Sequence, residues 1–201
     1  MRKKSLLKDA LVLFAITLLA AALLACVYSL TKDPIAKAAN EAKQKAYETV
    51  YPDVTFEATD EALLFRVGNT LADGTVKDGE TVLKRATVSE ILRAVDTNGN
   101  AVGYVVSAAS KSGYGGEITA VVGVTNAGEI CGFTVLSHSE TAGFGARCDE
   151  QDYQATFVGD QSADDVDLIS GATYTTNALK EICGAALVAV REAESGVSAD
   201  A

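Results

Sequence analysis

The feature that most constrains this chain is an uncharged apolar run of 22 residues near its N-terminus. The run extends from Ala10 to Thr31 and consists mainly of Leu, Ala, Val, Ile and Phe. At ~1.5 Å per residue, a helix of this length spans ~33 Å, which matches the hydrocarbon core of a bilayer. The sequence therefore predicts a transmembrane helix over residues 10–31, with membrane lipid as a partner.

The charges on the two sides of this run predict its orientation. Residues 1–9 carry a net charge of +3 and residues 10–201 carry −13, which gives −10 in total. Cytoplasmic flanks of membrane helices are enriched in Lys and Arg, so we expect residues 1–9 in the cytoplasm and the body outside. The acidity of the body also argues against nucleic acid as a partner, because phosphate binding needs clustered cations.

Two other interpretations of the run also place the body outside the cytoplasm. A cleaved signal peptide has a shorter apolar core than this run, although Ala20, Ala21 and Ala22 are small enough for a cleavage site. Residues 23–26, Leu-Leu-Ala-Cys, loosely resemble a bacterial lipobox, which would attach a lipid to Cys26. We favour an uncleaved anchor because the run is long enough to span a bilayer and apolar residues continue past residues 20–22.

The pattern of the body predicts an α+β fold with a mostly antiparallel sheet and packed helices. Residues 35–50 are good helix formers, and a helix should end before Pro52. Residues 53–65 are expected to form a short strand and a loop, and Gly68, Gly74 and Gly79 to mark a loop and hairpin. The predicted strands are residues 88–95, 102–108, 118–124 and 129–136, with a tight Asn-Gly hairpin over residues 96–100. A helix is the alternative for residues 88–95.

A second helix is predicted near the C-terminus, over residues 177–194. Apolar residues recur there at helical spacing, and Thr175 or Thr176 is a suitable N-cap. The expected organisation is a basic end, a membrane helix, a membrane-proximal helix with a linking region, one folded domain and a disordered tail. Their ranges are 1–9, 10–31, 32–85, 86–194 and 195–201.

The composition and motifs exclude several kinds of chemistry. One His and four scattered Cys argue against a zinc or haem site, and we expect no metal site and no catalytic residues. Residues 113–116, Gly-Tyr-Gly-Gly, begin like a dinucleotide fingerprint, but Ile118 stands where a third Gly is required. Cys131 and Cys148 could form a disulfide outside the cell, or the cysteines could be buried structural residues.

Three clusters of small residues remain as candidate functional loops: residues 113–118, 138–145 and 167–176. In the third, four hydroxyl residues, Ser170, Thr173, Thr175 and Thr176, precede the C-terminal helix. A helix N-terminus favours a phosphate group, although the same residues could be an ordinary capping sequence. His138 could be structural or a ligand contact, and Glu140 could cap the turn that follows it.

Taken together, the three clusters resemble bacterial FMN-binding domains. Residues 167–173, Asp-x-x-Ser-Gly-Ala-Thr, resemble the motif to which a flavin transferase, using FAD as donor, links FMN by a phosphoester. Residues 138–145, His-x-Glu-Thr-x-Gly-x-Gly, are similar to the family's HxETPGLG loop, with Ala142 where Pro is usual. Residues 113–118 match the stretch GYxGxI. Order and spacing agree in all three.

With its N-terminal span, the chain resembles the G subunits of Rnf-type ion-translocating oxidoreductase complexes. The related C subunit of the sodium-translocating NADH:quinone reductase is the second match, and it is usually longer. The resemblance implies an electron-carrying subunit in the cell membrane, with other subunits of the complex and a flavin transferase as partners. The ion that is translocated belongs to the whole complex, since one span offers no ion path. The alternative is a membrane-anchored binding or sensor lipoprotein without redox function.

The resemblance also implies roles for individual residues. Thr173 would carry covalent FMN, and Asp167 would be recognised by the flavin transferase. The remaining expected cofactor-binding residues are Ser170, Gly171, Ala172, Thr175, Thr176, Glu140, Thr141, Gly143, Gly145, Tyr114 and His138.

Overall fold

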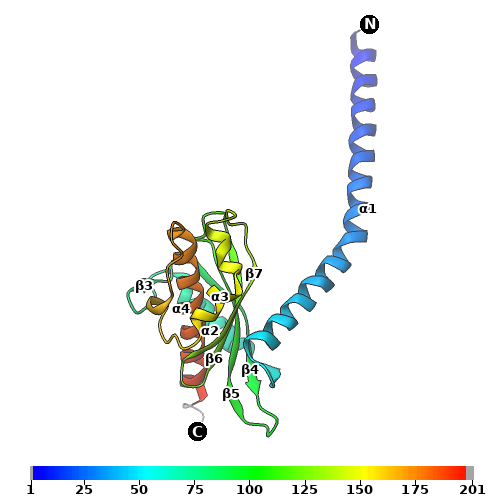
Figure 1. Cartoon of the computed structure of the whole chain (residues 1–201). Coiled ribbons are helices and arrows are strands. Elements are labelled where there is room, and N and C mark those ends of the chain that lie inside the picture. The colour runs from blue at the N-terminus through cyan, green and yellow to red at the C-terminus, as the bar shows by residue number, and fades with distance from the viewer. Residues whose placement is uncertain (1, 198–201) are drawn as a thin grey trace. The chain divides into compact units, whose positions relative to one another are not determined.

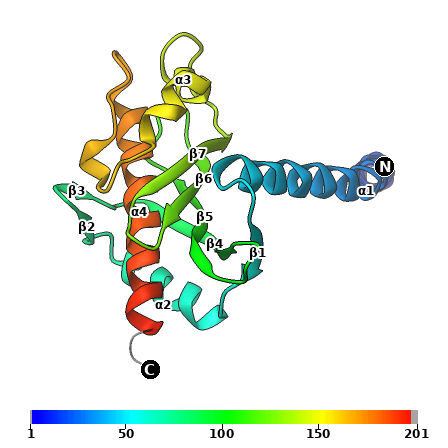
Figure 2. The same cartoon turned by 60° about the horizontal axis from the view of Figure 1, so that its bottom comes forward.

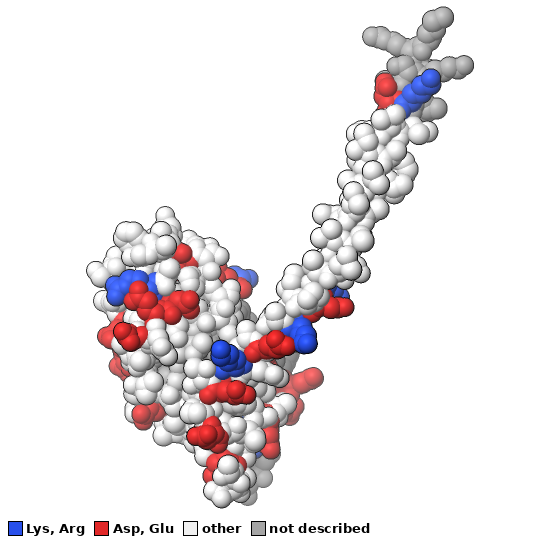
Figure 3. Space-filling model, turned by 45° about the vertical axis from the view of Figure 1, so that its right-hand side comes forward, with Lys and Arg blue, Asp and Glu red and all other residues white. Residues whose placement is uncertain are grey.

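The computed structural model describes the main chain of residues 2–197 and the side chains of residues 8–195 (Figure 1). The chain forms two compact units, one up to Ala42 and the other from Lys43 onward. Most of α1 (Arg2–Val50) makes up the first unit. Figure 3 shows that its apolar stretch is bare of charged side chains.

The helix α1 is long and apolar enough to cross a membrane by its length and composition. It contains the predicted helix over residues 10–31, whose side chains are all exposed in the structure. It also continues through Pro34 to Val50, so the helix predicted over residues 35–50 is part of α1. A proline inside a helix removes one main-chain hydrogen bond, and here the helix continues past it.

The second unit is built on an antiparallel sheet of five strands in the order β1-β4-β5-β6-β7. The strands are β1 (Thr55–Ala58), β4 (Ala86–Val95), β5 (Ala101–Ser110), β6 (Ile118–Thr125) and β7 (Ile130–Ser137). A separate hairpin pairs β2 (Lys77–Asp78) with β3 (Thr81–Val82). The helices of this unit after α1 are α2 (Glu61–Ala72), α3 (Gln151–Gln154) and α4 (Thr173–Val197), with 3-10 turns at Gly145–Asp149, Ala155–Phe157 and Ala163–Asp165. The predicted α+β class with a mostly antiparallel sheet is confirmed.

Successive side chains of the central strands point to opposite faces of the sheet, and both faces are buried. On one face Val106 and Val122, which are partners in the β5–β6 register, pack into the main core with α4. Figure 2 shows α4 lying along the sheet. On the other face Val105 and Val121 pack against the last turns of α1, including Tyr47. The Tyr47 hydroxyl also donates to the Glu90 carboxylate at 2.7 Å.

The region between α1 and β4 differs from the expectation of a loop and linking region. Residues 61–72 form the helix α2, and its N-cap Asp60 accepts a hydrogen bond from the main-chain N–H of Ala62. Its buried residues Leu63, Val67 and Leu71 recur every four positions and join the main core. This region therefore belongs to the folded unit, because an apolar stripe of this kind is stable only when it is buried.

The C-terminal helix is longer at both ends than predicted. It begins at Thr173 instead of Asn177, so Thr175 and Thr176 lie in its first turn and neither is the N-cap. It continues through Ser195 to Val197, where the sequence predicted a disordered tail. Residues 198–201 of that tail lie outside the described residues.

All four cysteines are free thiols. Cys148 and Cys183 are fully buried, and Cys131 is half-buried. Burial, with Asp149 and Glu140 nearby, raises the pKa of the Cys148 thiol to about 12. Such a thiol stays protonated and inert at neutral pH. Of the two interpretations from sequence, the structure agrees with structural cysteines and contains no Cys131–Cys148 disulfide.

Candidate functional site

A cavity of about 460 Å³ lies at the N-terminal end of α4. The residues that line it are Tyr114, Glu140, Thr141, Phe144, Gly145, Gly171, Ala172, Thr173, Tyr174 and Thr175. They come from all three clusters of small residues that the sequence analysis selected. The fold thus brings three segments to one site, although 19 residues separate the first from the second and 21 separate the second from the third.

The turn before α4 gives the site an exposed hydroxyl at a helix N-terminus. Gly171 has a φ of +79°, a left-handed conformation that suits glycine. The Ala172 N–H then donates to the Ile169 carbonyl at 3.0 Å, and the helix begins at the next residue, Thr173. The Thr173 side chain is exposed and lines the cavity. No acidic residue of α4 itself lies in its first turn, and the negative charge in contact with that turn is the Glu140 carboxylate, which accepts from the Thr175 hydroxyl.

Glu140 joins the three segments at the base of the cavity. Its side chain is only 9% exposed. Its carboxylate accepts hydrogen bonds from the Gly115 N–H, at 2.8 Å, and from the Thr175 hydroxyl. A Cβ atom on Gly145 would lie 2.5 Å from the same carboxylate, so only glycine fits there. Glu140 therefore fixes the relative positions of the loops that enclose the cavity.

Three aromatic rings form an exposed rim around the cavity. Tyr114, Tyr174 and Phe144 are 73%, 65% and 56% exposed, which is unusual for side chains of this size. The ring centroids of Tyr114 and Tyr174 are 6.3 Å apart. Phe144 packs against the open face of Gly171. An apolar rim beside a hydroxyl and a helix N-terminus suits a planar ring system that carries an anionic group.

Several residues predicted from the sequence do not line the cavity. Ser170 and Gly143 are exposed outside it. The Thr176 hydroxyl is buried in the turn, where it accepts from the Ile169 N–H and donates to the Ala172 carbonyl. His138 is half-buried, and its Nδ1 accepts from the Glu140 N–H at 3.1 Å. His138 and Thr176 thus support the main chain of the loops that form the site.

The Asp167 side chain is exposed and does not line the cavity. The main-chain carbonyl of Asp167 accepts from the Tyr153 hydroxyl at 2.7 Å, which fixes the chain before the turn. Nearby, burial and the charges of Asp165 and Asp167 raise the pKa of Asp160 to about 6. Among the described residues, no group of His, Cys, Asp or Glu side chains is arranged to hold a metal ion.

Sequence reasoning did not select Phe144 and Tyr174 as site residues. Both lie inside the predicted clusters, and both are large aromatic residues in loops or at a helix start. A large aromatic residue flanked by glycines or hydroxyl residues is a signal that could have identified them, since nothing in such a segment buries it locally.

Comparison with known proteins identifies the family of this chain. The G subunit of the ion-translocating oxidoreductase complex of Methanosarcina acetivorans is 31% identical to this chain over 186 residues, which cover 88% of this chain and 89% of the relative. The chain belongs to the G-subunit family of ion-translocating oxidoreductase complexes. The family resemblance found in the sequence is thereby confirmed.

Two domain families match separate parts of this G-family chain. The RnfG N-terminal region matches residues 1–50, and α1 ends at the same residue, Val50. The FMN-binding domain matches residues 113–188. Every residue that lines the cavity falls within this second range. The cavity is therefore the candidate cofactor site of the domain.

Other relatives belong to complexes that translocate different ions. The G subunit of a proton-translocating ferredoxin:NAD⁺ oxidoreductase complex in Clostridium ljungdahlii is 36% identical over 84 residues, 42% of this chain and 44% of the relative. The G subunit of a sodium-translocating complex of the same kind in Acetobacterium woodii is 30% identical over 103 residues, 51% of this chain and 49% of the relative. These two alignments thus cover about half of each chain.

Proposed function

We propose that this chain is an electron-carrying subunit of a membrane-bound oxidoreductase complex that couples electron transfer to ion translocation, with FMN linked through a phosphoester to Thr173. The observation that carries the proposal is the exposed Thr173 hydroxyl, placed at the first residue of α4 and on the wall of the cavity. The FMN-binding match over the same residues supports the identity of the cofactor.

The attachment can be written as a balanced transfer. The hydroxyl oxygen of Thr173 forms a bond to the FMN phosphorus of FAD, the bond between that phosphorus and the AMP part breaks, and AMP and the hydroxyl proton leave. The resulting phosphodiester keeps one negative charge. The N–H groups at the start of α4 can bind that charge, since a helix N-terminus stabilises anions.

The residues of the site have distinct parts in this proposal. When bound, FMN supplies the redox chemistry, and the protein positions it and tunes its environment. Tyr114, Phe144 and Tyr174 offer ring faces for contact with the flavin ring. Glu140 holds the three loops together, and Gly171 and Ala172 leave room for the ribityl chain. The chain has no catalytic residues of its own in this scheme and acts within the complex.

The partners follow from the same scheme. Other subunits of the complex receive and deliver the electrons, and a flavin transferase attaches the cofactor. Asp167 is available for recognition by the transferase, because its side chain is exposed six residues before Thr173. A covalent bond also prevents loss of the cofactor in a compartment where the cytoplasm cannot resupply it.

The test is fluorescence of the denatured protein after co-expression with a flavin transferase. We expect the wild-type band to fluoresce in a denaturing gel and Thr173→Ala to abolish the signal, because no acceptor oxygen remains. Ser139→Ala is the matched control, since that side chain is exposed, does not line the cavity and lies outside the motif of residues 167–173. Mass spectrometry of the peptide that contains Thr173 locates the adduct.

Two results would contradict the proposal. One is a dark wild-type band in the presence of an active transferase. The other is a wild-type protein that retains no flavin and is acylated at Cys26, which would favour the anchored lipoprotein without redox function.

A further inference from the structure

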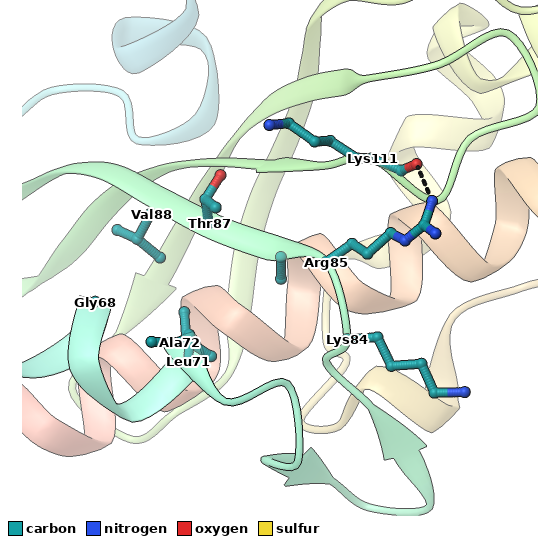
Figure 4. Close-up of a pocket in the computed structure, with 9 residues that line it drawn as sticks. Gly68, Leu71, Ala72, Lys84, Arg85, Thr87, Val88 and Lys111 are labelled. Atoms are coloured by element: carbon teal, nitrogen blue, oxygen red, sulfur yellow. Dashed lines mark hydrogen bonds between the residues drawn. The ribbon is translucent and has the colours of Figure 1, made fainter.

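A second cavity lies away from the cofactor site, between α2 and the first half of β4 (Figure 4). Its volume is about 510 Å³. Gly68, Leu71 and Ala72 of α2 form one wall, and Ala86, Thr87 and Val88 of β4 form the other. Neither the family matches nor the proposed flavin chemistry assigns a role to it.

Three cationic residues surround this cavity: Lys84, Arg85 and Lys111. The chain as a whole carries a net charge of −10, so such a group is an exception on its surface. Among the described residues, neither Lys84 nor Arg85 forms an ion pair with a carboxylate, and Lys111 has only an exposed contact with Glu117 at 3.9 Å. The cations are therefore available to an acidic group from outside the chain.

A buried carboxylate holds the two segments that carry these cations. Glu181 of α4 is 5% exposed and accepts hydrogen bonds from the Ser110 hydroxyl at 2.6 Å and the Ser112 hydroxyl at 2.9 Å. The Arg85 N–H points to the same carboxylate at 3.3 Å. The Arg85 guanidinium in turn donates to the Lys111 carbonyl at 3.4 Å (Figure 4). The cationic rim is thus built on fixed main-chain positions.

Gly68 supplies an independent sign that the cavity is used. It lies in the interior of α2, where glycine is a poor helix former. A Cβ atom built on Gly68 would meet nothing within 4 Å, and Gly68 has no left-handed φ. Packing within the chain therefore does not require glycine here. A larger residue at position 68 would place its side chain in the cavity. We infer that glycine stands here because the cavity holds a group from outside the chain.

The adjoining strand edge favours a polypeptide as that occupant. β1 pairs only with Leu92–Val95 of β4. Among the described residues, no strand pairs with the first half of β4 on that side, where Thr87 and Val88 line the cavity. An extended segment can lie along such an edge and place one side chain into an adjacent pocket. A small anion would use the cations and leave the strand edge unused.

We propose that this cavity docks an extended acidic segment of another subunit of the complex, with separate carboxylates of that segment bound by Lys84 and by Lys111, whose side chains point in different directions (Figure 4). Lys111 is three residues before Tyr114, which lines the cofactor cavity, so the docked segment adjoins the loop that encloses that site. This last relation rests on the proposed function, whereas the docking itself does not require flavin.

The experiment uses the full chain in the intact complex, purified from membranes through a tag on another subunit. We expect Gly68→Glu to reduce co-purification of this chain at least tenfold, because the new carboxylate occupies the cavity and neutralises the rim. Gly68→Gln is the matched control for size, and a smaller loss is expected from it. Lys84→Glu with Lys111→Glu should give a similar loss, whereas Lys45→Glu with Lys77→Glu, two exposed lysines elsewhere, should not.

A second measurement identifies the occupant. A carbodiimide joins a lysine amine to a carboxylate in contact with it, so treatment of the wild-type complex should link Lys84 to an Asp or Glu of another subunit. Gel fluorescence of each variant separates this proposal from the flavin proposal, because flavin per chain should be unchanged when docking is lost. Links from Lys84 only within this chain or to a second copy, or variants that co-purify like wild type, would overturn the docking proposal.

Discussion

At the scale of single residues, Glu140 does more for the site than its sequence context indicated. The sequence offered it as a ligand contact or as a cap for the next turn. The structure shows a buried carboxylate that accepts from one segment on each side of its own loop, through Gly115 and Thr175. No local pattern could predict this, because the two donors are 25 and 35 residues away in the chain. The motif selected Thr173, and the structure places that residue on the cavity wall, while FMN attachment to it stays a prediction.

The position of Glu140 predicts a loss of stability on truncation. Glu140→Ala leaves the buried Thr175 hydroxyl without an acceptor, which costs ~1–3 kcal/mol, and also removes the acceptor of the Gly115 N–H. We expect the free energy of unfolding to fall by ~2 kcal/mol or more, measured by urea denaturation of the full chain in detergent. Glu117→Ala in the neighbouring loop is the control, with an expected change of ~0.5 kcal/mol or less, since that side chain is exposed. Equal losses from both variants would refute a joining role for Glu140.

At the scale of secondary structure, the strands were easier to predict than the helices. Runs of β-branched residues and the tight Asn-Gly turn located the four long strands to within two residues. The helix α2 was missed because Gly68 was interpreted as loop punctuation, although Leu63, Val67 and Leu71 carry a helical repeat. The start of α4 was placed four residues late, since the hydroxyl residues there suggested a cap instead of a first turn. Both errors involve residues that line the two cavities.

Replacing a glycine by alanine should raise the stability of the fold in α2 and lower it in α4. Gly68→Ala is expected to stabilise the fold by ~1 kcal/mol, because the new methyl group meets open space and alanine favours a helix. Gly184→Ala in α4 should destabilise it, because its Cβ would lie 2.6 Å from the fully buried side chain of Leu83. Thermal or urea unfolding of the two variants measures the difference. A destabilising Gly68→Ala would show that the space beside α2 is not open.

At the scale of the whole molecule, the charge and hydropathy of the sequence predicted an apolar helix and a folded body. The boundary between the two units depends on packing. The apolar run and the acidic body were visible in the sequence, and α1 and the FMN-binding domain correspond to them. The sequence placed the start of the folded domain near residue 86, whereas the compact unit begins at Lys43. The reason is long-range packing: Tyr47 and Val50 are buried against strands that follow much later in the chain.

The proposed topology predicts which lysines are reachable from outside an intact cell. With the N-terminus in the cytoplasm, a membrane-impermeant amine reagent should label Lys77 in intact cells and Lys8 only after permeabilisation. Both side chains are exposed in the structure, so access differs only by the side of the membrane. Mass spectrometry of the two peptides gives the ratio. The reverse pattern would place the body in the cytoplasm.

The burial of α4 has a consequence for electron transfer. Only the first two residues of α4, Thr173 and Tyr174, are exposed in its first turn. Further along, Ala178, Leu179, Ile182 and Cys183 have no exposed surface, so this helix is among the parts of the chain that open last. A redox group bonded to Thr173 would therefore be held by a stable helix and would not move with a flexible loop. The position of this group relative to an electron donor or acceptor would then be set when the chain folds. The entropy lost in ordering the group would be lost once, on folding, and not again for each electron transferred.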